Sequence, residues 1–110
     1  MIKITAEVDN EGILKTCGIA GHAEGGPKGK DPVCGAVSAL AGTALRVLAK
    51  ETGVFLRADV STRGQLKLET EYAPEGKAFL FAVGAFLLEG LQFVSEEYPN
   101  HCTIHIKRRN

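Results

Sequence analysis

The sequence predicts an α+β fold in which a mainly antiparallel sheet carries two helices on one face, in the order β-β-α-β-β-α-β. Three observations lead to this prediction. Five short segments read as strands, because apolar and polar residues alternate along them or turn residues bound them. Two longer segments repeat apolar residues at the helical spacing. With 110 residues, the chain is long enough for one domain and too short for two, so we expect residues 1–110 to form a single domain.

The strands are expected as two hairpins followed by one separate strand. The predicted strands are residues 2–8, 13–19, 54–60, 65–71 and 102–107. The first two are joined by the turn residues Asp9-Asn10-Glu11-Gly12, and the next two by Thr62-Arg63-Gly64. The two hairpins and the last strand together make the predicted sheet.

The pair Asp31-Pro32 predicts the start of the first helix. Aspartate is a favoured N-cap, and proline suits the first helical position because its missing N–H is not needed there. Apolar residues then recur at helical spacing, and Gly53 is expected to cap the C-terminal end. The predicted helix runs from Pro32 to about Thr52.

The second helix follows Pro74 and is apolar around most of its circumference. Between residues 78 and 91 the only charged side chain is Glu89. One face of a sheet cannot cover a helix of this kind on all sides, so we expect a symmetric partner to cover the remainder and predict a homodimer.

Charge, composition and cysteine content argue against several classes of protein. Lys plus Arg and Asp plus Glu total 13 each, so no net charge attracts nucleic acid or acidic membrane. Residues 1–10 alternate apolar and polar side chains, unlike a signal peptide. The three cysteines form no C-x-x-C pair, which is typical of free thiols in a reducing compartment. We expect a cytoplasmic protein with no membrane association, no cofactor and no metal.

Cys34 and His22 form the candidate catalytic pair. His22 lies near the start of the glycine-rich segment 21–30 and Cys34 lies beyond it, so the two can meet if that segment doubles back. With Asp31 as N-cap, Cys34 takes the third helical position, where backbone amides and the helix dipole favour a thiolate. An imidazole that removes the thiol proton completes a nucleophilic pair, and nearby amides can stabilise an oxyanion. The matching reaction class is acyl transfer.

Taken alone, a cysteine at a helix start is more often a small buried hydrophobe than a nucleophile. The motif around this pair reads Gly21-His22-Ala23, Gly29, Asp31, Val33-Cys34 and Ala36-Val37-Ser38. This motif resembles that of the ribosomal-processing cysteine protease family, Prp. The chain length, the order of elements and the apolar second helix are also similar to that family.

The resemblance implies a cysteine endopeptidase that removes a short N-terminal extension from a large-subunit ribosomal protein, without nucleic acid as a required partner. The family's catalytic positions fall on Cys34 and His22. The supporting or substrate-binding positions that the motif implies are Asp31, Ser38, Gly21, Ala23 and Gly29. The chain departs from the family pattern at Pro32 and Gly35, where an aliphatic residue and alanine are usual, and neither departure removes a chemical group.

Asp31 and Ser38 each have a structural alternative. Capping needs only the position of Asp31, whereas orienting His22 needs a specific geometry, so we expect a helix cap first. Ser38 lies one turn after Cys34 on the same helix face, and it can instead hydrogen-bond its own helix backbone. The match to the motif favours the site for Ser38.

The remaining cysteines and histidines read as structural residues. Cys17 and Cys102 are expected to point into the core from the second and the last strand. His101 and His105 are expected on one face of the last strand without an acid or cysteine beside them. A metal site is therefore the weaker interpretation.

Two binding functions compete with catalysis. A glycine-rich segment ahead of a helix is typical of phosphate sites, but Glu24 and Asp31 stand where the Walker motif has Gly and Ser or Thr, and acidic residues repel phosphate. A non-catalytic ribosome- or RNA-associated module is the alternative that stays open, because the end of the chain, at residues 107–109, is basic. The sequence has no RNP-like aromatic pair or basic stripe to support it.

Overall fold

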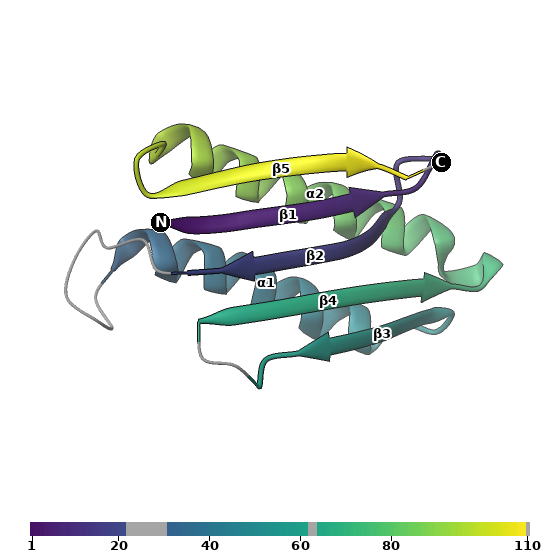
Figure 1. Ribbon diagram of the computed structural model, residues 1–110. Helices are drawn as coiled ribbons and strands as arrows, with labels where there is room; N and C mark the ends of the chain where they lie inside the picture. Colours follow the sequence, from purple (N-terminus) through teal and green to yellow (C-terminus); the bar gives the residue numbers. More distant parts are fainter. Residues whose placement is uncertain (22–30, 62–63, 110) are drawn as a thin grey trace.

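The computed structural model describes residues 1–21, 31–61 and 64–109, and these form the elements that the sequence predicts (Figure 1). The elements are β1 (Ile2–Val8), β2 (Leu14–Ala20), α1 (Pro32–Ala49), β3 (Val54–Asp59), β4 (Gln65–Tyr72), the short 3-10 helix η1 (Pro74–Gly76), α2 (Lys77–Glu97) and β5 (Cys102–Arg108). The α+β class and the order β-β-α-β-β-α-β are confirmed.

The strands form one sheet in the order β3-β4-β2-β1-β5. The pairs β1–β2, β2–β4 and β3–β4 are antiparallel, whereas β5 runs parallel to β1. Both helices lie behind the sheet in Figure 1, so they cover the same face. The start of β1, the end of β2 and the start of α1 meet at one end of the molecule, and this is where the site is built.

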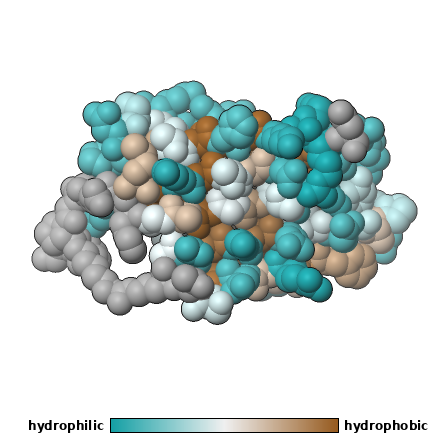
Figure 2. Space-filling model, viewed as in Figure 1, coloured by the Kyte–Doolittle hydropathy of each residue, from teal (hydrophilic) through white to brown (hydrophobic). Residues whose placement is uncertain are grey.

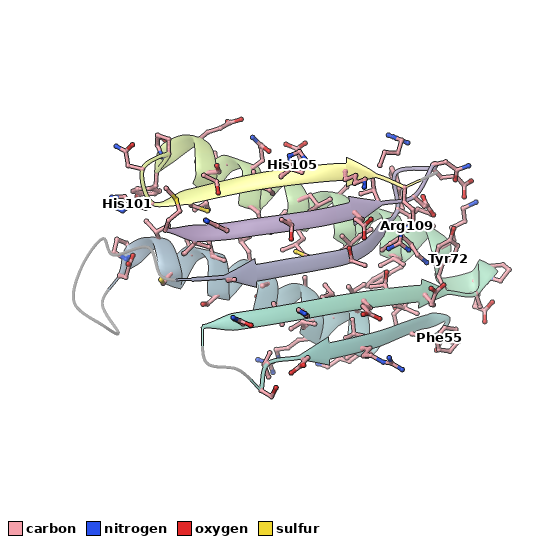
Figure 3. All side chains as sticks on the ribbon, in the orientation of Figure 1. Phe55, Tyr72, His101, His105 and Arg109 are labelled. Atoms are coloured by element: carbon pink, nitrogen blue, oxygen red, sulfur yellow. The ribbon has the colours of Figure 1, made fainter. Side chains whose placement is uncertain are left out.

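The other face of the sheet is open. Figure 2 shows that face, with hydrophilic side chains around its rim and hydrophobic atoms visible mainly along a central strip. Figure 3 shows Phe55 at the edge strand β3, where its side chain is 60% exposed. The hydrophobic core therefore lies on the helical side of the sheet.

Each helix packs one face against the core. The buried residues of α1 are Val33, Val37, Ala41, Ala44 and Leu48, and those of α2 are Leu80, Gly84, Leu87, Leu88, Leu91 and Val94. A side chain at Gly84 would bring a Cβ within 2.8 Å of the Cβ of Leu14, so glycine lets α2 approach β2 closely.

By length and composition alone, the segments Pro32–Ala49 and Pro74–Glu97 could each cross a membrane, but core helices of soluble proteins meet the same test.

The first helix ends earlier than the sequence predicts. It stops at Ala49 instead of about Thr52, and Lys50 is the C-terminal cap. The amides of Lys50 and Glu51 bond the carbonyls three residues before them, at 3.3 and 3.2 Å, which tightens the last turn. Gly53 follows with φ of +86°, where the chain turns toward β3.

Candidate active site

Asp31 caps α1 as the sequence predicts. Its backbone is extended, Pro32 follows at the first helical position, and its Oδ1 accepts hydrogen bonds from the amides of Val33 at 2.9 Å and Cys34 at 3.3 Å. Val33 is almost fully buried, so the first turn is held by its cap on one side and by the core on the other. This local structure fixes the backbone from which the Cys34 side chain projects.

Cys34 takes the third helical position and is half-buried. It lines an open groove with a volume of about 440 Å³ between α1 and the ends of β2 and β4. Ser38 is exposed and lines the same groove one turn farther along α1, as the helical spacing predicts. The only cysteine on this groove, among the described residues, is thus on a helix N-terminal turn and open to a ligand.

The backbone amides around Cys34 already have acceptors. Those of Val33 and Cys34 bond the Asp31 carboxylate, and that of Gly35 bonds the Asp31 carbonyl at 3.0 Å. The bond to the Cys34 amide is the longest of the three, so it is the easiest to exchange for another acceptor. Of these three amides, that of Cys34 is the one best able to turn to another acceptor, and the expected oxyanion role of the amides here stays a prediction.

Gly21 has a structural reason to be glycine. Its φ is +99°, and an added Cβ would lie 2.3 Å from the carbonyl oxygen of Met1. Its amide bonds the carbonyl of Gly64 at 3.0 Å, and it also lines the groove beside Cys34. The expected residues His22, Ala23 and Gly29 lie outside the described residues, so their roles stay predictions.

The other two cysteines are core residues, as predicted. Cys17 is 2% exposed and Cys102 is 0% exposed. Burial raises the pKa of the Cys17 thiol to about 11. Burial also raises the pKa of Cys102, and the nearby Cys34 adds to this rise. Both buried thiols are therefore protonated near neutral pH and poor nucleophiles.

The two C-terminal histidines lie at and within the last strand. His101 precedes β5, and its carbonyl accepts the Ile2 amide at 2.9 Å, whereas His105 is exposed within the strand (Figure 3). Within residues 1–21, 31–61 and 64–109, no three His, Cys, Asp or Glu side chains gather to hold a metal ion.

Sequence reasoning missed most of the residues that line the groove on either side of Cys34. The residues it did not single out as functional are Ile2, Ile19, Val37, Ala41, Gly42, Leu45, Val60, Gly64, Gln65 and Leu66. The helical spacing from Cys34 through Ser38 was a signal that could have found Gly42 and Leu45. The residues of the second hairpin had no such local signal, because the pairing of β4 with β2 brings them to the site.

One family model covers most of this chain, and solved structures share its fold. The sequence profile described as Cysteine protease Prp matches residues 1–103. Comparison with curated proteins gives no match. The ribosomal processing protease Prp of S. aureus, solved with a covalently linked product peptide, aligns with a TM-score of 0.86 at 23% identity, covering 97% of this chain and 100% of that chain. A Streptococcus mutans structure aligns with a TM-score of 0.79 at 27% identity, covering 99% of each chain. This chain belongs to the Prp family of cysteine proteases.

Proposed function

We propose that this protein is an endopeptidase in which Cys34 is the nucleophile and His22 the general base, and that residues 1–110 form its single domain. One observation carries the proposal. In a chain of a cysteine protease family, Cys34 is the described cysteine that lines an open groove, and it does so from the first turn of a capped helix. The other two thiols are buried.

The proposed reaction is acyl transfer to sulfur and then to water. His22 takes the thiol proton, and the Cys34 Sγ attacks the peptide carbonyl carbon to form a C–S bond. When the C–N bond breaks, the leaving amine takes the proton from His22, and a thioester remains. His22 then removes a proton from water, and the water oxygen attacks the thioester carbon. The C–S bond breaks, His22 returns the proton to the Cys34 sulfur, and the new carboxylic acid leaves and loses its proton to solvent.

Supporting roles follow from where the described residues lie. Asp31 caps the turn that presents the thiol, and Ser38 contacts substrate from the same groove wall. Gly21 lets the backbone turn beside the groove, because only glycine tolerates its positive φ next to Met1. Ala23 and Gly29 are proposed to support the site from residues that lie outside the described ones.

The proposed substrate is the N-terminal extension of a large-subunit ribosomal protein, cleaved in the cytoplasm without a cofactor. Two S. aureus structures support a peptide as the substrate class: that protein is described as a ribosomal processing protease, and it was solved with a product peptide and with a substrate peptide. The groove beside Cys34 is lined mostly by apolar side chains, which suits an extended apolar peptide.

The test is incubation with ribosomal proteins that carry their native N-terminal extensions, followed by intact-mass analysis. One trimmed product is expected from the native enzyme, and none from Cys34→Ala or His22→Ala. Cys17→Ala is the matched control, since it removes a buried thiol away from the groove and should leave cleavage intact. Trimming by Cys34→Ala that equals the native rate would refute the proposal.

The alternative, a non-catalytic ribosome- or RNA-associated module, predicts a different result for the same Cys34→Ala variant. If the protein is a binding module, Cys34→Ala retains its full function, and RNA binding falls steeply with added salt. A cysteine protease loses its function in that variant and shows no specific RNA binding.

We also propose that the protein is a homodimer through the outer surface of its helices. The aromatic side chains of Phe86 and Phe93 on α2 are 73% and 62% exposed, and Val47 on α1 is 37% exposed. Between the helices, Leu40, Ala82 and Val83 help to line a groove of about 470 Å³. An apolar surface of this kind is covered most simply by a second copy of the same chain.

Sedimentation velocity at micromolar concentration tests the dimer. Phe86→Glu should shift the protein toward monomer, whereas Phe55→Glu, at a similarly exposed phenylalanine on the open face of the sheet, should not. A native protein that sediments only as monomer would exclude the dimer.

A further inference from the structure

The α1 wall of the groove is a single ridge of the helix. Cys34, Ser38 and Gly42 follow one another at intervals of one turn, and Leu45 continues the ridge. The facing wall includes Ile19 of β2 and Leu66 of β4, which are register partners in the sheet. Apart from the thiol and the Ser38 hydroxyl, this part of the groove offers apolar surface to a ligand.

Gly42 is unusual because it stands in the interior of α1. Glycine destabilises a helix interior relative to alanine, so a glycine there calls for a reason. In α2 the reason is packing: an added Cβ would meet Leu14 within 2.8 Å at Gly84 and Leu40 within 2.9 Å at Gly90. At Gly42, apart from its two chain neighbours and the backbone of its own helix, no atom of the described residues lies within 4 Å of the added Cβ, so packing against the rest of the described fold does not require glycine.

Gly35 is the other helical glycine with open space around its Cβ position, and it does not line the groove. Gly42 is thus the helical glycine whose missing side chain enlarges the groove itself. It lies eight residues after Cys34, which places it about 12 Å along the helix axis from the thiol. An extended peptide advances about 3.3 Å per residue, so in a substrate that runs along α1 the residue beside Gly42 is three or four positions from the scissile bond.

We propose that Gly42 determines specificity by leaving space for a large apolar side chain of the substrate, three or four residues from the bond that is cleaved. The side chain packs on the Gly42 backbone between Leu45 and the apolar wall of Leu66 and Val60. This inference rests on the proposed function, because the distance is counted from Cys34 as the nucleophile. It adds a residue and a substrate preference to that function.

The test uses peptides that span the bond mapped by intact mass on the ribosomal substrate. The third and fourth residues on each side of that bond are set in turn to Ala or Phe, and kcat/KM is measured for each peptide. The native enzyme is expected to prefer Phe over Ala at one of these positions by at least about tenfold. Gly42→Leu fills the space, so it should lower this ratio by about 10- to 100-fold.

Gly42→Ala and Thr43→Ala are the matched variants. Both replace an α1 residue by the best helix former, so Gly42→Ala should raise Tm by about 4 °C and Thr43→Ala should raise it less. Thr43 is exposed on the side of α1 that faces α2, so its variant should keep the native Phe-to-Ala ratio. Gly42→Ala should lower that ratio by a smaller factor than Gly42→Leu, and it tests the inference even if the leucine variant does not fold.

The outcomes separate the inference from the proposed function. If the native enzyme trims its substrate but folded Gly42→Leu and Gly42→Ala keep the native ratio at every position, the inference is overturned and the proposed function stands. If the native enzyme trims no extended ribosomal protein, the proposed function fails, and the inference fails with it.

Discussion

Replacing Asp31 separates its role as a helix cap from a role in catalysis. Its Oδ1 accepts two amide hydrogen bonds at the start of α1, from Val33 and from Cys34. Asp31→Ala removes the acceptor of both hydrogen bonds and the negative charge at the helix N-terminus. Asp31→Asn keeps a side-chain oxygen of the same reach and removes only the charge.

The magnitudes follow from the cap and from the size of the chain. Loss of an N-cap costs about 0.5–2 kcal/mol, and loss of the favourable charge at the dipole costs about 0.3–1 kcal/mol. For 110 residues, an unfolding entropy of about 2.1 cal/mol/K per residue means that 1 kcal/mol lowers Tm by about 4 °C. We therefore expect a fall of about 3–12 °C for Asp31→Ala, which loses both contributions, and about 1–4 °C for Asp31→Asn.

The activity of Asp31→Asn distinguishes a capping role from a catalytic one. A residue that only caps the helix should leave activity almost unchanged when its side-chain oxygen is kept. If Asp31 only caps α1, Asp31→Asn keeps kcat/KM within about threefold of the native value, measured well below Tm. Asp31→Ala loses more, because the turn that presents Cys34 loosens. A loss of about 100-fold in Asp31→Asn, equivalent to about 2.7 kcal/mol, with Tm close to native, would refute the capping role and assign the carboxylate to His22.

The remaining predictions concern the thiols, one turn and one glycine. Iodoacetamide should label Cys34 fastest, since it lines the groove whereas burial raises the pKa of Cys17 to about 11; equal rates by peptide mass would contradict this. Burial raises the pKa of the Asp9 carboxyl, but hydrogen bonds from two backbone amides at 2.9 Å and from the Tyr72 hydroxyl, together with the charge of Lys15, lower that pKa more, so that it lies below its usual value. Ionised Asp9 thus stabilises the fold above about pH 4, and this stabilisation is lost as the pH falls through its lowered pKa. The difference in the free energy of unfolding in urea between the native protein and Asp9→Ala should therefore become smaller as the pH falls below about 4. Gly53→Ala should destabilise the fold by about 2–4 kcal/mol in thermal unfolding, because φ is +86° and the new Cβ would lie 2.7 Å from the Gly76 amide nitrogen. A Tm within 2 °C of native would show that the strain at Gly53 is relieved at little cost, about 0.5 kcal/mol.

The elements themselves were predictable because their signals are local. Asp31-Pro32 marks the start of α1 through capping and a fixed proline φ, and both act within one turn. The sequence predicts the end of α1 three residues too late, at about Thr52, because a glycine such as Gly53 commonly caps a helix. The final turn instead tightens at Lys50 and Glu51, whose amides bond the carbonyls three residues before them. The spacing of apolar residues does not indicate this change of hydrogen bonding.

One wall of the site was predictable and the other was not. Cys34 and Ser38 share a face because residues four apart on a helix do so in any fold. Gln65 and Leu66 reach the groove because β4 pairs with β2 in the register Ile19↔Leu66 and Ala20↔Gln65. No spacing within the second hairpin indicates that pairing.

The sequence by itself determined the strands, the helices, the capped turn that carries Cys34 and the family motif, because each depends on neighbours within a few residues. Only the tertiary structure decided the sheet order β3-β4-β2-β1-β5, the parallel pairing of β5 with β1 and the groove between α1 and β4. Strand order depends on which edges are free when distant segments meet, and periodicity along the chain is the same for every order. The depth of the groove likewise depends on how far α1 stands from the sheet, which the packing of both helices against one face sets.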